Sequence, residues 1–124
     1  MSALPGPLLG VANTQHYYGN GANRLVKLSG FQITSSDYYL IYVFGEANGN
    51  ANVFCLSGGH TSINVGKVFG DGTGWEFYKD NSGNYYVKVN AWGQANISVY
   101  QSTRKITTEM ITYDTTDLTP ITVL

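Results

Sequence analysis

Few side chains in this chain have the types and spacing that catalysis requires. A serine or cysteine nucleophile needs a base such as histidine, and the two histidines, His16 and His60, have no recognisable partner in the sequence. We interpret His60 as a loop residue. Two distant histidines and the single cysteine, Cys55, also do not resemble a zinc site. We therefore expect neither a nucleophilic centre nor a metal.

Carboxylates offer the other route to catalysis, since most glycosidases use two of them a few ångströms apart. The candidates all fall in or near predicted turns and termini, where turn chemistry explains them: Asp37, Glu46, Asp71, Asp80, Asp114 and Asp117. Asp71 lies in a glycine-rich stretch, but one carboxylate in a turn makes neither a phosphate loop nor a calcium loop. The sequence predicts a protein that is not an enzyme and uses no cofactor.

Tyrosines supply the most informative pattern for function. The segment 75 to 101 is typical of three antiparallel strands on which Tyr78, Tyr86 and Tyr100 share one outward face. Tyrosine and tryptophan offer rigid amphipathic surface for recognising proteins or sugars. We predict that these tyrosines, together with Trp92 at a loop tip, bind a ligand. Alternatively, the row of three tyrosines contacts another subunit or only covers the sheet. Trp92 could instead pack onto its own hairpin.

The register of this segment rests on two short loops. Residues 81 to 83 fit a three-residue hairpin loop with glycine in the left-handed position. That loop predicts three pairs: Phe77 with Val87, Tyr78 with Tyr86, and Glu76 with Lys88. A second such loop at 92 to 94 predicts that Tyr86 pairs with Tyr100. A slip of one residue would bury polar side chains instead.

Composition limits the class of protein. A chain of 124 residues is long enough for one domain and too short for two ordinary ones. Charged residues make up only 12% of the chain, and the net charge of −1 attracts neither nucleic acid nor anionic lipid. The apolar stretches are far shorter than the roughly 20 residues that cross a bilayer. We expect no nucleic-acid partner and no membrane insertion.

The periodicity predicts an all-β fold. No window has the apolar spacing of a helix, whereas β-branched and aromatic runs recur between clusters of Gly, Asn, Asp and Ser. The expected strands are 24–33, 38–45, 51–57, 62–69, 75–79, 84–91, 95–101 and 106–113. We predict a jelly-roll-like antiparallel β-sandwich over 24–124, preceded by an extended arm or linker over 1–23. Cys55 is expected to be a small buried apolar residue.

The strand 38–45 is apolar on both faces. One face carries Tyr38, Leu40, Tyr42 and Phe44, and the other carries Tyr39, Ile41 and Val43. A strand that is apolar on both sides needs two partners, and in so small a sandwich the second partner could be another subunit. We predict that Tyr39, Ile41 and Val43 form an oligomer interface.

Five segments of the chain carry a family resemblance: Phe69 to Gly72, Trp75 to Asp80, Gly83 to Val89, Ile97 to Tyr100, and the threonine-rich end 115 to 123 with its late proline. In these segments the chain resembles the C-terminal receptor-binding head domains of phage and prophage tail fibres, and the resemblance covers residues 24 to 124. It implies a homotrimer at a fibre tip that binds a bacterial surface polysaccharide or outer-membrane protein. It also implies a virion or extracellular location, and it transfers no site residue.

The sequence thus favours a receptor-binding tail-fibre head. A free-standing carbohydrate-binding module or lectin and a structural virion or baseplate subunit are the alternatives. A small hydrolase ranks last.

Overall fold

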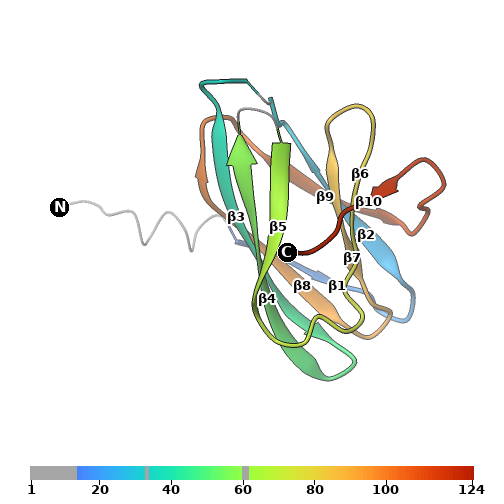
Figure 1. The fold of residues 1–124 in the computed structure, drawn as a ribbon. Coiled ribbons are helices and arrows are strands. Elements are labelled where there is room, and N and C mark those ends of the chain that lie inside the picture. The colour runs from blue at the N-terminus through green and yellow to red at the C-terminus, as the bar shows by residue number, and fades with distance from the viewer. Residues whose placement is uncertain (1–13, 33, 60–61) are drawn as a thin grey trace.

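The fold is a sandwich of two five-stranded antiparallel sheets (Figure 1), which the computed structural model describes for residues 14–32, 34–59 and 62–124. The first sheet has the order β1 (Thr14–Tyr18), β8 (Gln94–Ser102), β3 (Tyr38–Ala47), β4 (Asn50–Gly59) and β5 (Ser62–Phe69). The second has the order β10 (Thr119–Pro120), β6 (Phe77–Lys79), β7 (Tyr85–Val89), β2 (Arg24–Ser29) and β9 (Thr107–Thr112). The predicted all-β sandwich is confirmed.

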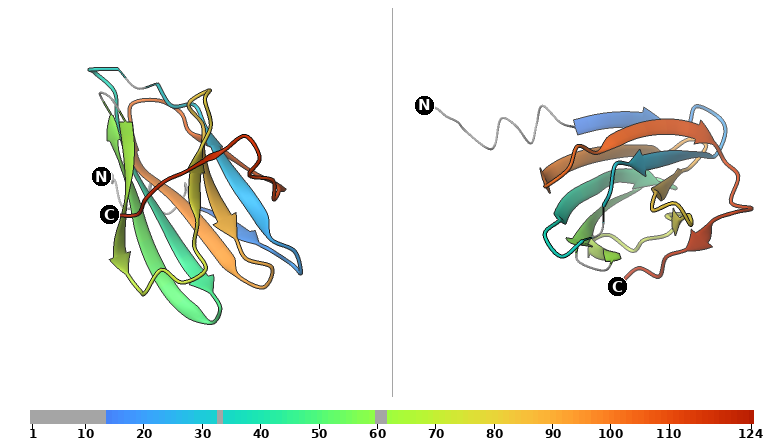
Figure 2. Two further views of the ribbon diagram at one scale, coloured as in Figure 1. Left: turned by 45° about the vertical axis from the view of Figure 1, so that its right-hand side comes forward. Right: turned by 90° about the horizontal axis from the view of Figure 1, so that it is seen from above.

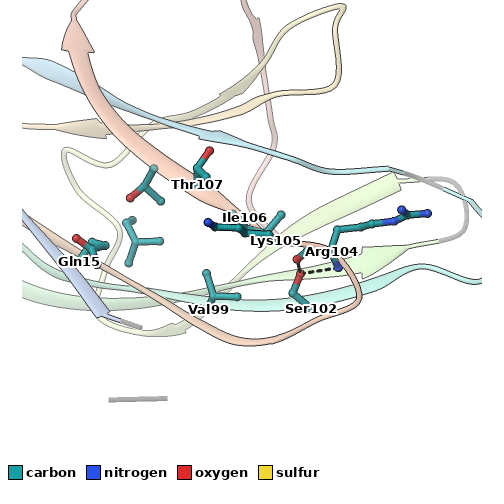
Figure 3. Close-up of a pocket in the computed structure, with 9 residues that line it drawn as sticks. Gln15, Val99, Ser102, Arg104, Lys105, Ile106 and Thr107 are labelled. Atoms are coloured by element: carbon teal, nitrogen blue, oxygen red, sulfur yellow. Dashed lines mark hydrogen bonds between the residues drawn. The ribbon is translucent and has the colours of Figure 1, made fainter. Parts of the chain in front are cut away.

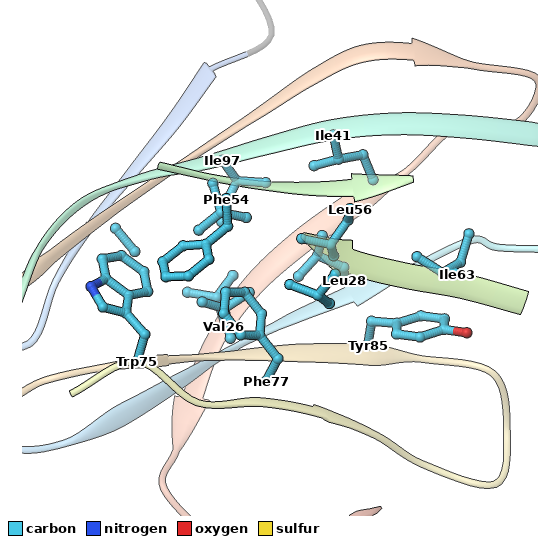
Figure 4. Close-up of a cluster of buried hydrophobic side chains, with 14 of the residues drawn as sticks. Val26, Leu28, Ile41, Phe54, Leu56, Ile63, Trp75, Phe77, Tyr85 and Ile97 are labelled. Carbon is cyan, nitrogen blue, oxygen red and sulfur yellow. The ribbon is translucent and has the colours of Figure 1, made fainter. Parts of the chain in front are cut away.

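The core lies between the two sheets, whose layers are seen edge-on in Figure 2. Alternate residues of β2, β3, β4, β7 and β8 point into it, as expected for sheets with one buried face. Its centre is aromatic: the ring of Phe54 lies 5.2 Å from that of Trp75 and 4.9 Å from that of Phe77 (Figure 4). Aromatic pairs at these distances stabilise a core beyond the area that they bury. Within the described residues there is no helix, and hence none able to span a membrane.

The predicted oligomer residues belong to this core. Tyr39, Ile41 and Val43 are almost completely buried within the single chain, and Figure 4 shows Ile41 pointing at the opposite sheet. The prediction that they contact another subunit is wrong. The sequence established that β3 is apolar on both faces but did not establish which face meets the second sheet.

Part of the expected N-terminal arm is a strand of the first sheet. Thr14–Tyr18, placed in the arm, form β1 and pair with β8 from Thr14 opposite Ser98 to Tyr18 opposite Gln94. A five-residue strand at a sheet edge has little periodicity to reveal it, and its pairing partner lies about eighty residues away. The short β10 escaped prediction for the same reason.

Of the two predicted loops, the first is confirmed. Phe77 pairs with Val87 and Tyr78 with Tyr86, and Gly83 has a φ of 88°. A salt bridge of 3.2 Å joins Lys88 Nζ to Glu76 Oε2.

The second predicted hairpin is wrong, because β7 and β8 lie in different sheets. β7 pairs with β6 and β2, so both of its edges are occupied, while β8 pairs with β1 and β3. Val89 and Ile97 point inward in either arrangement. Side-chain parity therefore could not distinguish a hairpin from a turn that crosses between the sheets.

The C-terminal segment closes one flank of the sandwich. It leaves β10 in the second sheet and reaches β5 in the first, where Val123 forms a parallel bridge with Val65. Leu124 N donates to Val65 O at 2.8 Å, and Lys67 N donates to Leu124 O at 3.2 Å. On the other flank, Tyr17 of β1 bonds to Thr108 of β9 through their hydroxyls.

Candidate functional site: a hollow beside Trp92

The turns at one end of the sandwich enclose a hollow of about 520 Å³, which we call the Trp92 hollow. Figure 1 shows the β1–β2, β3–β4 and β7–β8 turns at this common end. The lining residues come from these turns, from the end of β7 and from the segment before β6: Asn23, Asn48, Gly49, Gly74, Lys88, Asn90, Ala91, Trp92 and Gly93. Loops held at the end of a rigid sandwich are a common position for recognition sites.

Trp92 is the most exposed aromatic residue among the described residues, with 71% of its surface accessible. Its ring lies over Gly21, where an added β-carbon would be 3.3 Å from Cη2 of the indole, and its centroid is 6.4 Å from that of Tyr18. The backbone beneath is fixed by a hydrogen bond of 2.7 Å from Gly21 N to Ala91 O. The indole is thus supported on one side and accessible on another.

Three asparagines from three different turns converge in the hollow. Asn23 Oδ1 accepts a hydrogen bond of 2.9 Å from Ala91 N, which orients its amide group. A β-carbon at Gly74 would lie 2.8 Å from Asn90 Nδ2 and 2.9 Å from Asn48 Nδ2, so both amides lie against the Gly74 backbone. Asn90 Oδ1 is buried and has no hydrogen-bond partner among the described residues. A buried acceptor without a protein partner is uncommon, and this one lies behind the accessible surface of the hollow.

The hollow presents no free charge. Its one ionisable lining residue is Lys88, whose ammonium group binds Glu76 at 3.2 Å and lies 5.8 Å from the centre of the Tyr113 ring. Neutral amides around an exposed indole suit a neutral polar molecule with apolar C–H faces, such as a sugar.

The predicted tyrosine row does not exist as one surface. Tyr78 and Tyr86 are only 8% and 6% exposed, and they pack with Leu25 beneath the C-terminal segment that contains Tyr113 and Leu118. Tyr100 belongs to the other sheet and is 57% exposed. The row depended on the second hairpin, so it fails with that hairpin. Tyr78 and Tyr86 therefore present little surface to a ligand.

Hydrogen bonds explain why two tyrosines are buried there. Tyr86 donates to Asp80 Oδ2 at 2.6 Å, and Tyr78 donates to Glu76 Oε1. The half-buried Tyr113 donates to the same oxygen of Glu76 at 2.8 Å. Burial alone would raise the pKa of Asp80, but hydrogen bonds from Tyr86, Asn84 and Ser82 outweigh it and lower that pKa to about 2. Burial and the bond to Asp80 raise the pKa of Tyr86 to about 12. The network fastens the C-terminal segment and performs no evident chemistry.

Most of the other residues that the sequence analysis considered for chemistry have structural roles. The carboxylates of Asp71, Asp80 and Asp114 accept backbone hydrogen bonds two residues on, as predicted turn residues do. His16 Nε2 lies 2.7 Å from Gln94 Oε1 on the outer side of the first sheet, whereas His60 lies outside the described residues. Cys55 is half-buried rather than buried, on the outer side of β4. Across the described ranges, no group of three or more His, Cys, Asp or Glu could hold a metal ion.

A second cleft, of about 490 Å³, opens on the flank between β1, β8 and β9 (Figure 3). The core residue Ile97 and the partly buried Val99 and Ile106 line it. Its Arg104 side chain points away from the other labelled residues in Figure 3 and binds Asp37 Oδ1 at 3.1 Å. Gln15, Ser102 and Lys105 supply polar groups to this cleft, but none of its lining residues is aromatic, so the Trp92 hollow is the better candidate site.

Of the site residues, the sequence identified Trp92 but missed Asn23, Asn48 and Asn90. Asn48 lies in a predicted turn, where turn chemistry alone explains it. Asn23 lies in the predicted arm and Asn90 in the predicted strand 84–91, so no sequence signal joined the three. A scan against protein-family models gives no match to this chain, and searches of curated proteins and of solved structures give none either. The site must therefore be interpreted from its own geometry.

Proposed function

We propose that this chain is a non-enzymatic binding domain that recognises a neutral cell-surface glycan through the Trp92 hollow, as the distal domain of a phage tail fibre. The observation that carries the glycan part is an indole that is 71% exposed beside three convergent asparagines. The indole offers an apolar surface to the C–H face of a sugar ring, and the amides can both donate to and accept from its hydroxyls.

The tail-fibre part is supported by the sequence resemblance over residues 24 to 124. In that setting the chain is a homotrimer, located at the fibre tip in the virion, and its receptor is a surface polysaccharide or outer-membrane protein of the host. The absence of charge in the hollow favours polysaccharide over an acidic or basic protein segment.

A free-standing carbohydrate-binding module is the runner-up, because it would use the same hollow. The two proposals differ in assembly, and light scattering separates them: a monomer at micromolar concentration contradicts the fibre tip and favours the module. A structural virion or baseplate subunit is the third option, and it requires no ligand in the hollow.

The test is binding of the purified chain to intact candidate bacteria, followed by a glycan array. Replacing Trp92 by alanine should weaken binding about tenfold or more, as loss of an aromatic anchor does. Because Trp92 is exposed, the thermal midpoint should change little.

Asparagine variants supply the matched comparison. Asn90→Ala removes an amide from the hollow, whereas Asn81→Ala removes one from the exposed tip of the β6–β7 hairpin. We expect only the first to lose binding. Unchanged binding by the Trp92 and Asn90 variants excludes the hollow as the site, and absence of binding to any cell or glycan contradicts the proposed function itself.

A further inference from the structure

The outer side of the first sheet carries a patch of apolar side chains, which outward Ser57, Asn64, Asn96 and Ser98 flank. We call it the outer apolar face and define it by its outward side chains: Tyr38, Leu40, Tyr42 and Phe44 of β3, Val53 and Cys55 of β4, Phe69 of β5 and Tyr100 of β8. Tyr42 and Tyr100 meet edge to face, with ring centroids 6.1 Å apart. Within the described residues, nothing packs over these side chains. A sheet face exposed to water normally carries polar residues instead.

Charge is almost absent from this side of the sheet. Of the seven basic and eight acidic residues, only Glu46 occupies an outward position on the described strands of the first sheet, at the far end of β3. The second sheet differs: its outer side carries Lys27, Glu76, Lys88 and Glu109, and its buried tyrosines are covered by the chain's own C-terminal segment. Depletion of charge together with enrichment in aromatic residues is the composition of an interface core.

We infer that the outer apolar face is the surface through which copies of this chain associate. A face with almost no charge can meet the same face of other copies, in a pair or around a three-fold axis, without opposing like charges. A charged partner surface would lose its hydration here and gain no ion pair in return. The outer side of the second sheet is such a charged surface, so the copies meet through their first sheets.

The size of the face fits this role. Four strands about 4.8 Å apart, over about seven residues that each rise about 3.3 Å, give a flat footprint on the order of 20 by 23 Å. This footprint is about 460 Å² on each copy, which is the size of a weak or transient contact. We therefore expect an association that is weak and depends on protein concentration.

The inference does not depend on the glycan proposal, since Trp92 lies in a turn outside the face. It also replaces the predicted interface at Tyr39, Ile41 and Val43 with the opposite face of the same strand.

Multi-angle light scattering on the full chain tests the inference from about 1 to about 100 µM. We expect the mass to rise with concentration to a multiple of 13.5 kDa. Phe44→Lys and Tyr100→Lys each place a charge on the face and should hold the chain at 13.5 kDa. Thr107→Lys, an exposed position on the outer side of the second sheet, is the matched control and should associate as the wild type does.

Cys55 gives a second measurement on the unmodified protein. As the single cysteine, half-buried on the face, it should be alkylated by iodoacetamide more slowly as protein concentration rises. A wild-type mass of 13.5 kDa throughout, or lysine variants that associate like the control, would overturn the inference. A Trp92→Ala chain that associates normally but binds no glycan keeps the two proposals separate.

Discussion

Removal of one buried hydroxyl tests whether the tyrosines of the β6–β7 hairpin are structural. Tyr86→Phe deletes the hydrogen bond of 2.6 Å to Asp80 and leaves the aromatic ring in place. A hydrogen bond to a charged group contributes about 1.5 to 3 kcal/mol. Asp80 is half-buried and keeps three other donors, from Ser82 and Asn84, so solvent and these donors offset part of the loss. We expect a decrease of about 1 kcal/mol in the free energy of unfolding.

Tyr100→Phe is the matched comparison, since Tyr100 is 57% exposed on the other sheet. The free energy of unfolding of the Tyr100→Phe variant should differ from that of the wild type by less than about 0.5 kcal/mol. Urea denaturation of both variants at neutral pH and at one protein concentration measures the difference. Equal losses at the two positions would refute the assignment, because a single exposed row of tyrosines makes them equivalent.

The difference between the wild type and Tyr86→Phe should also depend on pH. The pKa of Asp80 is lowered in the folded state from 3.8 to about 2, so its stabilisation is present above about pH 4 and is lost as pH falls toward 2. The pKa of Tyr86 is raised from 10.0 to about 12, so that contribution is present below pH 10 and is lost as pH rises toward 12. The advantage of the wild type should therefore be largest between about pH 4 and pH 10. An advantage that does not vary with pH would contradict the hydrogen bond.

Two further predictions concern the hollow and the core. Gly74→Ala and Gly83→Ala both place a side chain at positive φ, but only at Gly74 would the β-carbon meet neighbouring atoms, Asn90 Nδ2 at 2.8 Å and Asn48 Nδ2 at 2.9 Å. Gly83→Ala should lower the free energy of unfolding by about 1 kcal/mol. Gly74→Ala should lower it by about 1 kcal/mol more and should also weaken glycan binding. Equal stability of the two variants in urea would contradict the packing of the amides. Phe54→Ala removes a fully buried ring that contacts two other rings, and thermal and urea unfolding should show a loss of about 3 to 5 kcal/mol. A loss below about 1 kcal/mol would mean that Phe54 is not at the centre of the core.

Contacts across the β6–β7 hairpin were predictable because its turn sets the register. Residues 81 to 83 carry the residue types of a three-residue loop, and the pairs Phe77–Val87 and Tyr78–Tyr86 follow from it. The residues that point inward on β7 and β8 were predictable from the alternation of side chains along a strand. Trp92 was predictable as an exposed aromatic because it lies at a turn, away from any alternating strand.

Other features depended on which sheet each strand joins, and only the tertiary structure decided that. Parity shows that Tyr86 and Tyr100 both point outward, but one is covered by the C-terminal segment of the second sheet and the other is exposed on the first. Parity also shows that β3 has two apolar faces without showing that Tyr39, Ile41 and Val43 meet the opposite sheet. The convergence of Asn23, Asn48 and Asn90 joins turns that are far apart in the sequence. Local alternation and turn chemistry are encoded over a few neighbouring residues, whereas the pairing of distant strands is chosen by the packing of the whole core.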